Sequence, residues 1–165
     1  MDNIILIGMP GSGKSTVGVL LAKIIGYRFI DTDLLIQEKE ERKLFEILRD
    51  SGNDYFAAVE NEVNAAVKAH KTVIATGGSV IYGREAMMHL KSLGTIVFLD
   101  VDLCELKNRI NNLSTRGIMF KGGATLDDIY NERMPLYKKF ADVTVKCDDS
   151  SLAENATKIA TALGL

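Results

Sequence analysis

Gly8-Met9-Pro10-Gly11-Ser12-Gly13-Lys14-Ser15 carries the strongest structural signal in the chain. The segment has the form Gly-x-x-x-x-Gly-Lys-Ser, and it stands between an apolar run at 4–7 and a helical pattern at 14–25. Its glycines let backbone N–H groups turn inward around phosphate oxygens, and the helix start adds partial positive charge. The segment predicts a P-loop whose nucleotide-binding residues are Gly11, Ser12, Gly13, Lys14, Ser15 and Thr16.

Within this loop, Lys14 is expected to reach the β- and γ-phosphates, and Ser15 to coordinate Mg²⁺. Kinases, GTPases, ATPase motors and binding modules all use P-loops. The guanine-reading run Asn-Lys-x-Asp is absent, and 165 residues leave no room for the extra domains of most motors. A small kinase that uses ATP and Mg²⁺ and a nucleotide-binding module both stay open at this point, and we favour the kinase.

Apolar runs and helical periods alternate along the rest of the chain. We expect strands at 4–7, 28–30, 72–75, 95–99 and 143–145. We expect helices at 14–25, at 34–49 with a break near Arg42, from about 56 to 70, and at 84–93, 103–111, 125–140 and 152–163, with Pro135 kinking the helix that contains it. The alternation predicts one α/β domain, 1–165, built on a parallel sheet.

Two polar stretches are interpreted by their composition. The charged run at 38–43 is predicted to be a solvated face and not a binding tract. The stretch at 112–124 contains three glycines and lacks a clean period, so it is predicted to be a mobile loop.

The overall composition excludes several classes of protein. Hydrophobic residues make up 47% and charged residues 25%, and the net charge is −2, which argues against a nucleic-acid-binding domain. Because the chain has neither an 18-residue apolar run nor a basic segment before its first apolar stretch, we expect no membrane span and a cytoplasmic location. Cys104 and Cys147 are expected to be reduced thiols without a metal.

Polar residues and glycines follow two of the predicted strands. Asp31 and Asp33 end the second strand, and Gly77-Gly78 follows the third. Ligands of open α/β sheets bind at the carboxyl ends of the strands. One carboxylate could support Mg²⁺ and the other accept the proton of an acceptor hydroxyl; the alternative role for each is a helix N-cap. For the glycine pair, close approach to a substrate and a simple turn are equally open.

Two arginines are candidates for charge recognition. Arg116 lies in the predicted mobile loop, where a closing lid could bring it onto the transferring phosphoryl group; a solvated loop arginine is the alternative. Arg133 shares a helix face with Ile129, Tyr130, Leu136 and Tyr137, so its charge requires either a protein carboxylate or a ligand anion.

Taken together, these segments resemble the shikimate kinase family over nearly the whole chain. The shared segments are the P-loop, the Phe-Ile-Asp-Thr-Asp run ending at Asp33, the Thr-Gly-Gly run ending at Gly78, the loop arginine, and Glu132-Arg133-Met134-Pro135-Leu136-Tyr137. The resemblance implies a P-loop kinase fold with strand order 2-3-1-4-5, a lid at about 112–124 and an acceptor-binding helical segment at about 33–70. It also implies phosphorylation of the 3-hydroxyl of shikimate, by a chain we expect to be a monomer.

By position, the resemblance assigns roles to individual residues. Asp33 would contact the acceptor hydroxyls, Asp31 would support the metal, and Arg116 would be the lid arginine. Gly77, Gly78, Glu60 and Arg133 would form the acceptor site, with Arg133 on the acceptor carboxylate. Arg109 would pack near adenine, although a surface helix position is equally open.

Three segments depart from the family pattern. The family's Phe-Arg-x-x-Glu reads Phe56-Ala57-Ala58-Val59-Glu60, so Ala57 replaces an arginine that grips the shikimate carboxylate. Ser79 replaces a glycine, and the lid's Arg-Pro-Leu reads Arg116-Gly117-Ile118. Glu60 thereby loses its usual partner, so another cation, such as Arg49 or Arg84, or the acceptor itself should meet it.

Three hypotheses follow. The first is a shikimate kinase, and the second is a related kinase whose acceptor is another hydroxylated or amino-hydroxy metabolite. The third is a nucleotide-binding regulatory protein without catalysis, against which the intact Lys14, Ser15, Asp33 and Arg116 argue.

Overall fold

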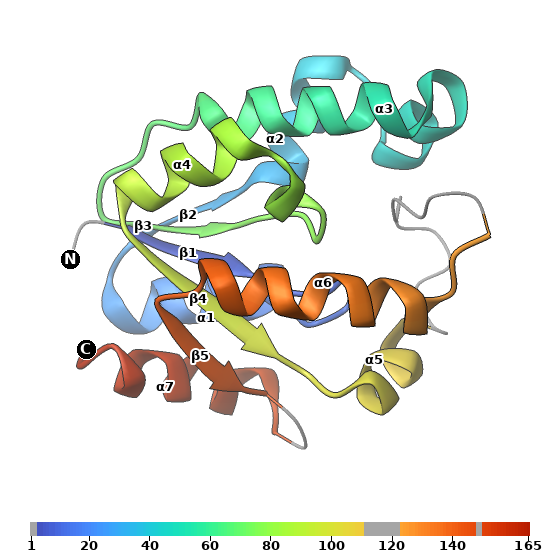
Figure 1. Cartoon of the computed structure of the whole chain (residues 1–165). Helices are drawn as coiled ribbons and strands as arrows, with labels where there is room; N and C mark the ends of the chain where they lie inside the picture. Colours follow the sequence, from blue (N-terminus) through green and yellow to red (C-terminus); the bar gives the residue numbers. More distant parts are fainter. Residues whose placement is uncertain (1–2, 111–122, 148–149) are drawn as a thin grey trace.

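A five-stranded parallel sheet forms the centre of the molecule (Figure 1). The computed structural model describes residues 3–110, 123–147 and 150–165. The strands are β1 (Asn3–Ile7), β2 (Arg28–Asp31), β3 (Thr72–Ala75), β4 (Thr95–Asp100) and β5 (Val143–Lys146). They lie in the order β2-β3-β1-β4-β5, which confirms the predicted topology.

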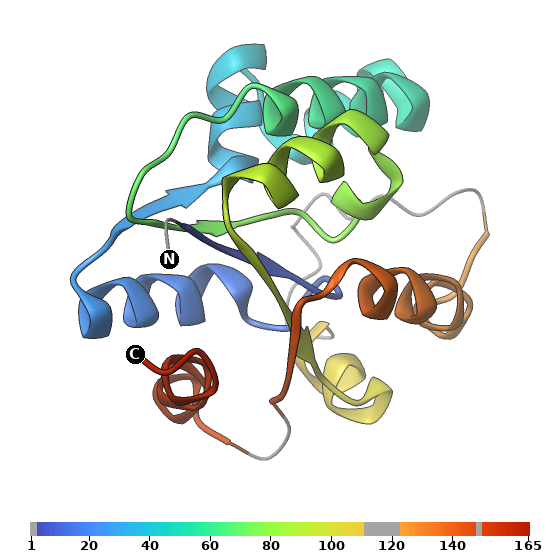
Figure 2. The ribbon, with the colours of Figure 1, turned by 60° about the vertical axis from the view of Figure 1, so that its left-hand side comes forward.

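The apolar runs form the inner strands because parallel sheets are covered on both faces. All five residues of β1 and all four of β3 are buried. The helices are α1 (Lys14–Ile25), α2 (Thr32–Glu40), α3 (Leu44–Ala65), α4 (Arg84–Leu93), α5 (Leu103–Ile110), α6 (Leu126–Phe140) and α7 (Leu152–Ala162), with a 3₁₀ turn, η1 (Val80–Tyr82). Helices α1 and α7 pack together on one face, and α3 and α4 pack together on the opposite side (Figures 1 and 2).

Helix α3 differs from the prediction for its region. The predicted break near Arg42 is confirmed, since α2 ends at Glu40 and Glu41 takes a left-handed conformation with φ 53°. The second predicted helix does not reach 70, because α3 ends at Ala65. Val67 is 5% exposed and packs into the main core from the following loop. Its apolar side chain continued the helical spacing in the sequence and so led to the longer predicted helix.

Within the described part of the chain, no helix combines the length and apolarity that a membrane span requires.

Candidate active site

The P-loop connects β1 to α1, and its glycines have the backbone conformations that the turn requires. Gly11 and Gly13 have φ values of 79° and 92°, which side-chain-bearing residues rarely adopt. Space is also restricted, because a Cβ atom on Gly13 would lie 2.9 Å from Leu152 Cδ2. The start of α7 thus leaves no room for a side chain at Gly13.

Lys14 is buried beneath this loop. Its Nζ donates hydrogen bonds to the carbonyl oxygens of Gly8 and Met9, both at 2.8 Å, and only 7% of the residue is exposed. Burial lowers the pKa of Lys14 to about 8, and the carboxylate of Asp33 is the largest influence that opposes this shift. The lysine is therefore fixed close to the position where the loop would receive phosphates.

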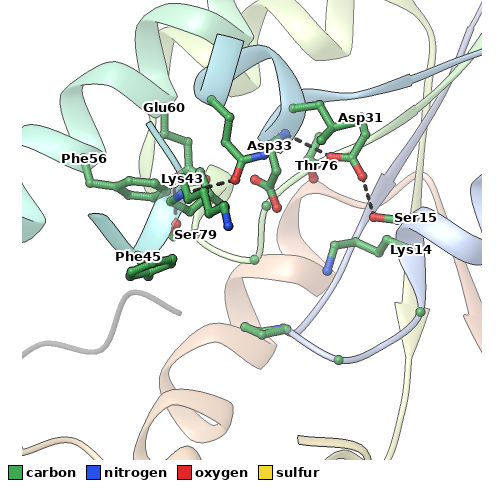
Figure 3. Close-up of a pocket in the computed structure, with 18 of the residues that line it drawn as sticks. Lys14, Ser15, Asp31, Asp33, Lys43, Phe45, Phe56, Glu60, Thr76 and Ser79 are labelled. Atoms are coloured by element: carbon green, nitrogen blue, oxygen red, sulfur yellow. Dashed lines mark hydrogen bonds between the residues drawn. The ribbon is translucent and has the colours of Figure 1, made fainter. Parts of the chain in front are cut away.

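Ser15 and Asp31 meet at the carboxyl end of β2 (Figure 3). The Ser15 hydroxyl donates to Asp31 Oδ2 at 2.6 Å. Asp31 Oδ1 accepts from the backbone N–H of Asp33 at 3.0 Å, so Asp31 is the N-cap of α2 as well. Hydroxyl and carboxylate oxygens are the hard ligands that Mg²⁺ prefers, and Mg²⁺ bound with phosphates needs only one or two from the protein. The pair fits the ion.

Arg109 lies against the outside of the P-loop. Its guanidinium donates to the carbonyl of Ser12 at 3.3 Å and to Glu105 Oε1 at 2.7 Å. The next residue, Ile110, would contact a Cβ on Gly11 at 3.0 Å. The end of α5 therefore packs against the P-loop.

A cavity of about 570 Å³ opens beside the P-loop and extends beneath α2 and α3. The sequence-predicted residues that line it are Gly11, Gly13, Lys14, Ser15, Thr16, Asp31, Asp33, Glu60, Gly77, Gly78 and Arg133. Ser12 is fully buried under the loop, and Arg116 lies outside the described residues, as does most of the predicted lid. Cavities of this size accommodate small metabolites.

The two glycines after β3 provide space where acidic side chains converge. A Cβ on Gly77 would lie 2.6 Å from Glu60 Oε2 and 2.9 Å from Asp33 Oδ1. A Cβ on Gly78 would lie 2.7 Å from Pro10 Cδ in the P-loop. The pair is thus more than a simple turn, because only glycine lets the β3 loop, Asp33 and the P-loop approach one another.

Arg133 and Tyr137 hold α6 against this loop. Arg133 is 3% exposed, and its guanidinium carbon lies 5.4 Å from the centre of the Tyr82 ring. The Tyr137 hydroxyl donates to the carbonyl of Gly78, and its ring stacks on Phe98 at 5.2 Å. Helix α6 thereby places the arginine at the wall of the cavity.

Comparison with known proteins agrees with this geometry. The family model described as shikimate kinase matches residues 10–164. The chain belongs to the shikimate kinase family. A shikimate kinase of Clostridium botulinum (strain Okra / Type B1) is 41% identical over 143 residues, which cover 84% of each chain. A shikimate kinase of Sulfurihydrogenibium sp. is 32% identical over 99% of this chain and 98% of its own.

A solved structure, shikimate kinase from Acinetobacter baumannii in complex with shikimate, superposes with a TM-score of 0.88. It is 29% identical and covers 99% of this chain and 94% of its own. Fold and family are therefore both established, and this chain is a kinase.

Glu60 has a different partner from those that the sequence suggested. The Ser79 hydroxyl donates to Glu60 Oε1 at 2.6 Å. Arg49 instead pairs with its neighbour Asp50 at 2.7 Å, and Arg84 is exposed on α4. The donor to Glu60 is therefore Ser79, itself one of the departures from the family pattern.

This hydrogen bond leaves part of the carboxylate unsatisfied. Glu60 is 3% exposed, and its Oε2 has no hydrogen-bond partner among the described residues. Burial raises the pKa of Glu60 to about 7; the Ser79 hydrogen bond opposes the rise, and the charge of Asp33 adds to it. An uncommitted acidic oxygen therefore faces Asp33 across Gly77.

Sequence reasoning did not single out several lining residues, among them Lys43 and Phe45. Lys43 is exposed, as the interpretation of 38–43 as a solvated face predicts, but it also lines the cavity. Composition could not separate it from its neighbours, because the direction of a side chain in a charged run depends on where one helix ends and the next begins. The only sequence signal was the following pair, Leu44-Phe45, since apolar residues beside a lysine indicate a partly buried wall.

Proposed function

We propose that this protein transfers the γ-phosphoryl group of ATP to the 3-hydroxyl of shikimate, with Mg²⁺. One observation carries the proposal: Lys14, Ser15 and Asp31 of the phosphate side and Asp33, Gly77 and Arg133 of the acceptor side line a single cavity. Membership in the shikimate kinase family supports the choice of acceptor. We expect the protein to act in the cytoplasm as a monomer.

Each residue has a chemical task in this proposal. Asp33 accepts the proton of the attacking hydroxyl as the new oxygen–phosphorus bond forms and the bond to the leaving ADP oxygen breaks. Lys14 stabilises negative charge on the phosphates during transfer. Ser15 and Asp31 hold the metal, which neutralises phosphate charge when bound. Arg133 fixes the acceptor carboxylate, and Arg109 borders the adenine.

The test is ADP release with ATP, Mg²⁺ and shikimate, followed by identification of the phosphorylated oxygen by ³¹P–¹H NMR. D33N should lower kcat at least about a hundredfold, because the proton acceptor is lost. D127N is the matched control, since about half of the Asp127 side chain is exposed and its ion pair among the described residues is with Lys107 at 2.9 Å. Activity toward shikimate no better than toward unrelated polyols would refute the assignment.

A second candidate keeps the kinase but changes the acceptor. A separate cavity of about 140 Å³ lies beside Ala57 and is bordered by Asp54, Glu132 and Arg133. It could receive a substituent, such as an amine, that shikimate lacks. An acceptor panel of hydroxylated and amino-hydroxy acids distinguishes the two, and ATP binding without turnover on any member would favour a regulatory protein.

A further inference from the structure

The cations that line the 570 Å³ cavity differ in what they already bind. Among its described lining residues, Lys14, Lys43 and Arg133 carry positive charge. Lys14 is committed to the carbonyls of Gly8 and Met9, and Arg133 is buried over the Tyr82 ring. Lys43 is exposed, and its ammonium group forms no ion pair with any residue that the structure describes.

The basic neighbours of Lys43 are engaged elsewhere. Lys39 pairs with Glu62 at 2.6 Å, and Arg42 pairs with Glu40 at 2.9 Å. Figure 3 shows the Lys43 side chain extending into the cavity, where Phe45 and Phe56 also point. In this charged run, Lys43 is therefore the cation directed to the acceptor side.

The backbone around Lys43 is well fixed. Lys43 is the N-cap of α3, with φ −70° and ψ 154°, and its N–H donates to Glu46 Oε2 at 2.7 Å. The N–H of Leu44 donates to Gln37 Oε1 at 3.2 Å, which ties this turn to α2. The positive end of the α3 dipole lies at the same place and adds to the lysine's attraction for an anion.

The acceptor side needs such a cation. Position 57, where the family has arginine, is alanine, and it borders the smaller cavity and not the larger one. The P-loop would bind the phosphates of the nucleotide. Without Lys43, the acceptor carboxylate would have Arg133 as its one cationic partner among the described lining residues. The rings of Phe45 and Phe56 provide an apolar wall for the carbon ring that bears such a carboxylate.

We propose that Lys43 is a specificity-determining residue that binds the carboxylate of the acceptor together with Arg133, in place of the arginine missing at position 57. The proposal rests on the proposed function, since it names a contact to the same acceptor. It predicts that the negative charge of the acceptor, and not its ring, is what Lys43 recognises.

The experiment compares shikimate with its methyl ester as acceptors for wild type and K43M, which keeps the apolar stem and the N-cap backbone. K43M should raise KM for shikimate about tenfold, because it removes one exposed charge-assisted hydrogen bond. It should leave kcat, KM for ATP and KM for the ester within about twofold. K43R should stay close to wild type, and A57R should restore the KM of K43M.

K39M is the matched control, because Lys39 belongs to the same charged run but does not line the cavity. It should change none of these constants. Suppose that wild type phosphorylates shikimate but K43M changes KM for the acid and for the ester equally, or changes neither. The proposed role of Lys43 would then be refuted, while the proposed function would stand. If wild type does not phosphorylate shikimate, the proposed function and this inference both fall.

Discussion

At the scale of single residues, Glu60 and Ser79 show how a lost ion pair is replaced. A buried carboxylate whose partner is removed is costly, whereas one neutral hydrogen bond together with a raised pKa allows it to remain. Ser79, one of the departures from the family pattern, supplies the hydrogen bond to this carboxylate.

S79A should destabilise the protein by about 1–3 kcal/mol, because it removes the Ser79 hydroxyl that donates to the carboxylate of Glu60, a residue that is 3% exposed. Urea unfolding at pH 8 measures the loss. S92A is the control, since the Ser92 hydroxyl lies at the surface on the carbonyl of His89, and it should change stability by less than about 0.5 kcal/mol. Equal losses in the two variants would contradict the role of Ser79.

The titration of Glu60 gives a second prediction at this scale. Its folded pKa, about 7, lies above the ordinary value of 4.5, so the folded protein binds the extra proton. This contribution to stability is complete below pH 4.5 and is lost as pH rises through 7, by up to about 3 kcal/mol. In E60Q that part of the pH dependence should disappear, as measured by urea unfolding from pH 5 to 8. A profile parallel to wild type would show that Glu60 does not titrate in this range.

At the scale of elements, Gly52 divides α3 into two parts. Its φ of 83° and ψ of 174° lie in a region that is essentially restricted to glycine. The part before it carries Leu44 and Phe45 on the cavity wall, and the part after it carries Phe56 and Glu60. The bend allows one helix to contribute two sections of the same wall.

G52A should cost about 1–3 kcal/mol and raise KM for the acceptor, because the first part of α3 would have to move. G26A is the matched control: Gly26 also has open space around a Cβ, but it lies in the ordinary left-handed region with φ 72° and ψ 30°. It should cost about 1 kcal/mol and leave KM unchanged. Urea unfolding and acceptor kinetics check both variants, and an unchanged acceptor KM in G52A would contradict the bend's role.

The bounds of the elements show what could be predicted from the sequence. Strand β3, helix α4 and the start of α1 were predicted at their observed bounds, because buried runs and glycine-punctuated periods give local signals. The strand order came from the family resemblance, since no local pattern reveals which strands pair. The end of α3, the turn η1 and the direction of Lys43 depend on tertiary packing, which periodicity does not record.

The candidate site also contains features with a local sequence signal and features that depend on tertiary packing. The P-loop could be predicted in full, because its glycines, lysine and serine are consecutive. The partner of Glu60 could not, because Ser79 reaches it only after β3 is placed beside β2. The roles of Arg116 and of the lid stay predictions, since they lie outside the described residues.

At the scale of the whole molecule, three charged side chains are buried at one end of the sheet. Lys14, Glu60 and Arg133 are 7%, 3% and 3% exposed, and the charges of Lys14 and Arg133 both lower the pKa of Glu60. Burying charge opposes folding unless the charges compensate one another. We therefore expect these buried charges to lower the stability of the fold locally while they provide charged groups for binding ionic substrates.

The position of β1 at the centre of the sheet has a consequence for how the chain is made. Its neighbours are β3, which begins at Thr72, and β4, which begins at Thr95. Long-range parallel pairing is slow to form, and synthesis proceeds from the N-terminus. The P-loop strand is translated before both of its partners, so chains halted before Thr95 should leave the β4 edge of β1, which is apolar, unpaired.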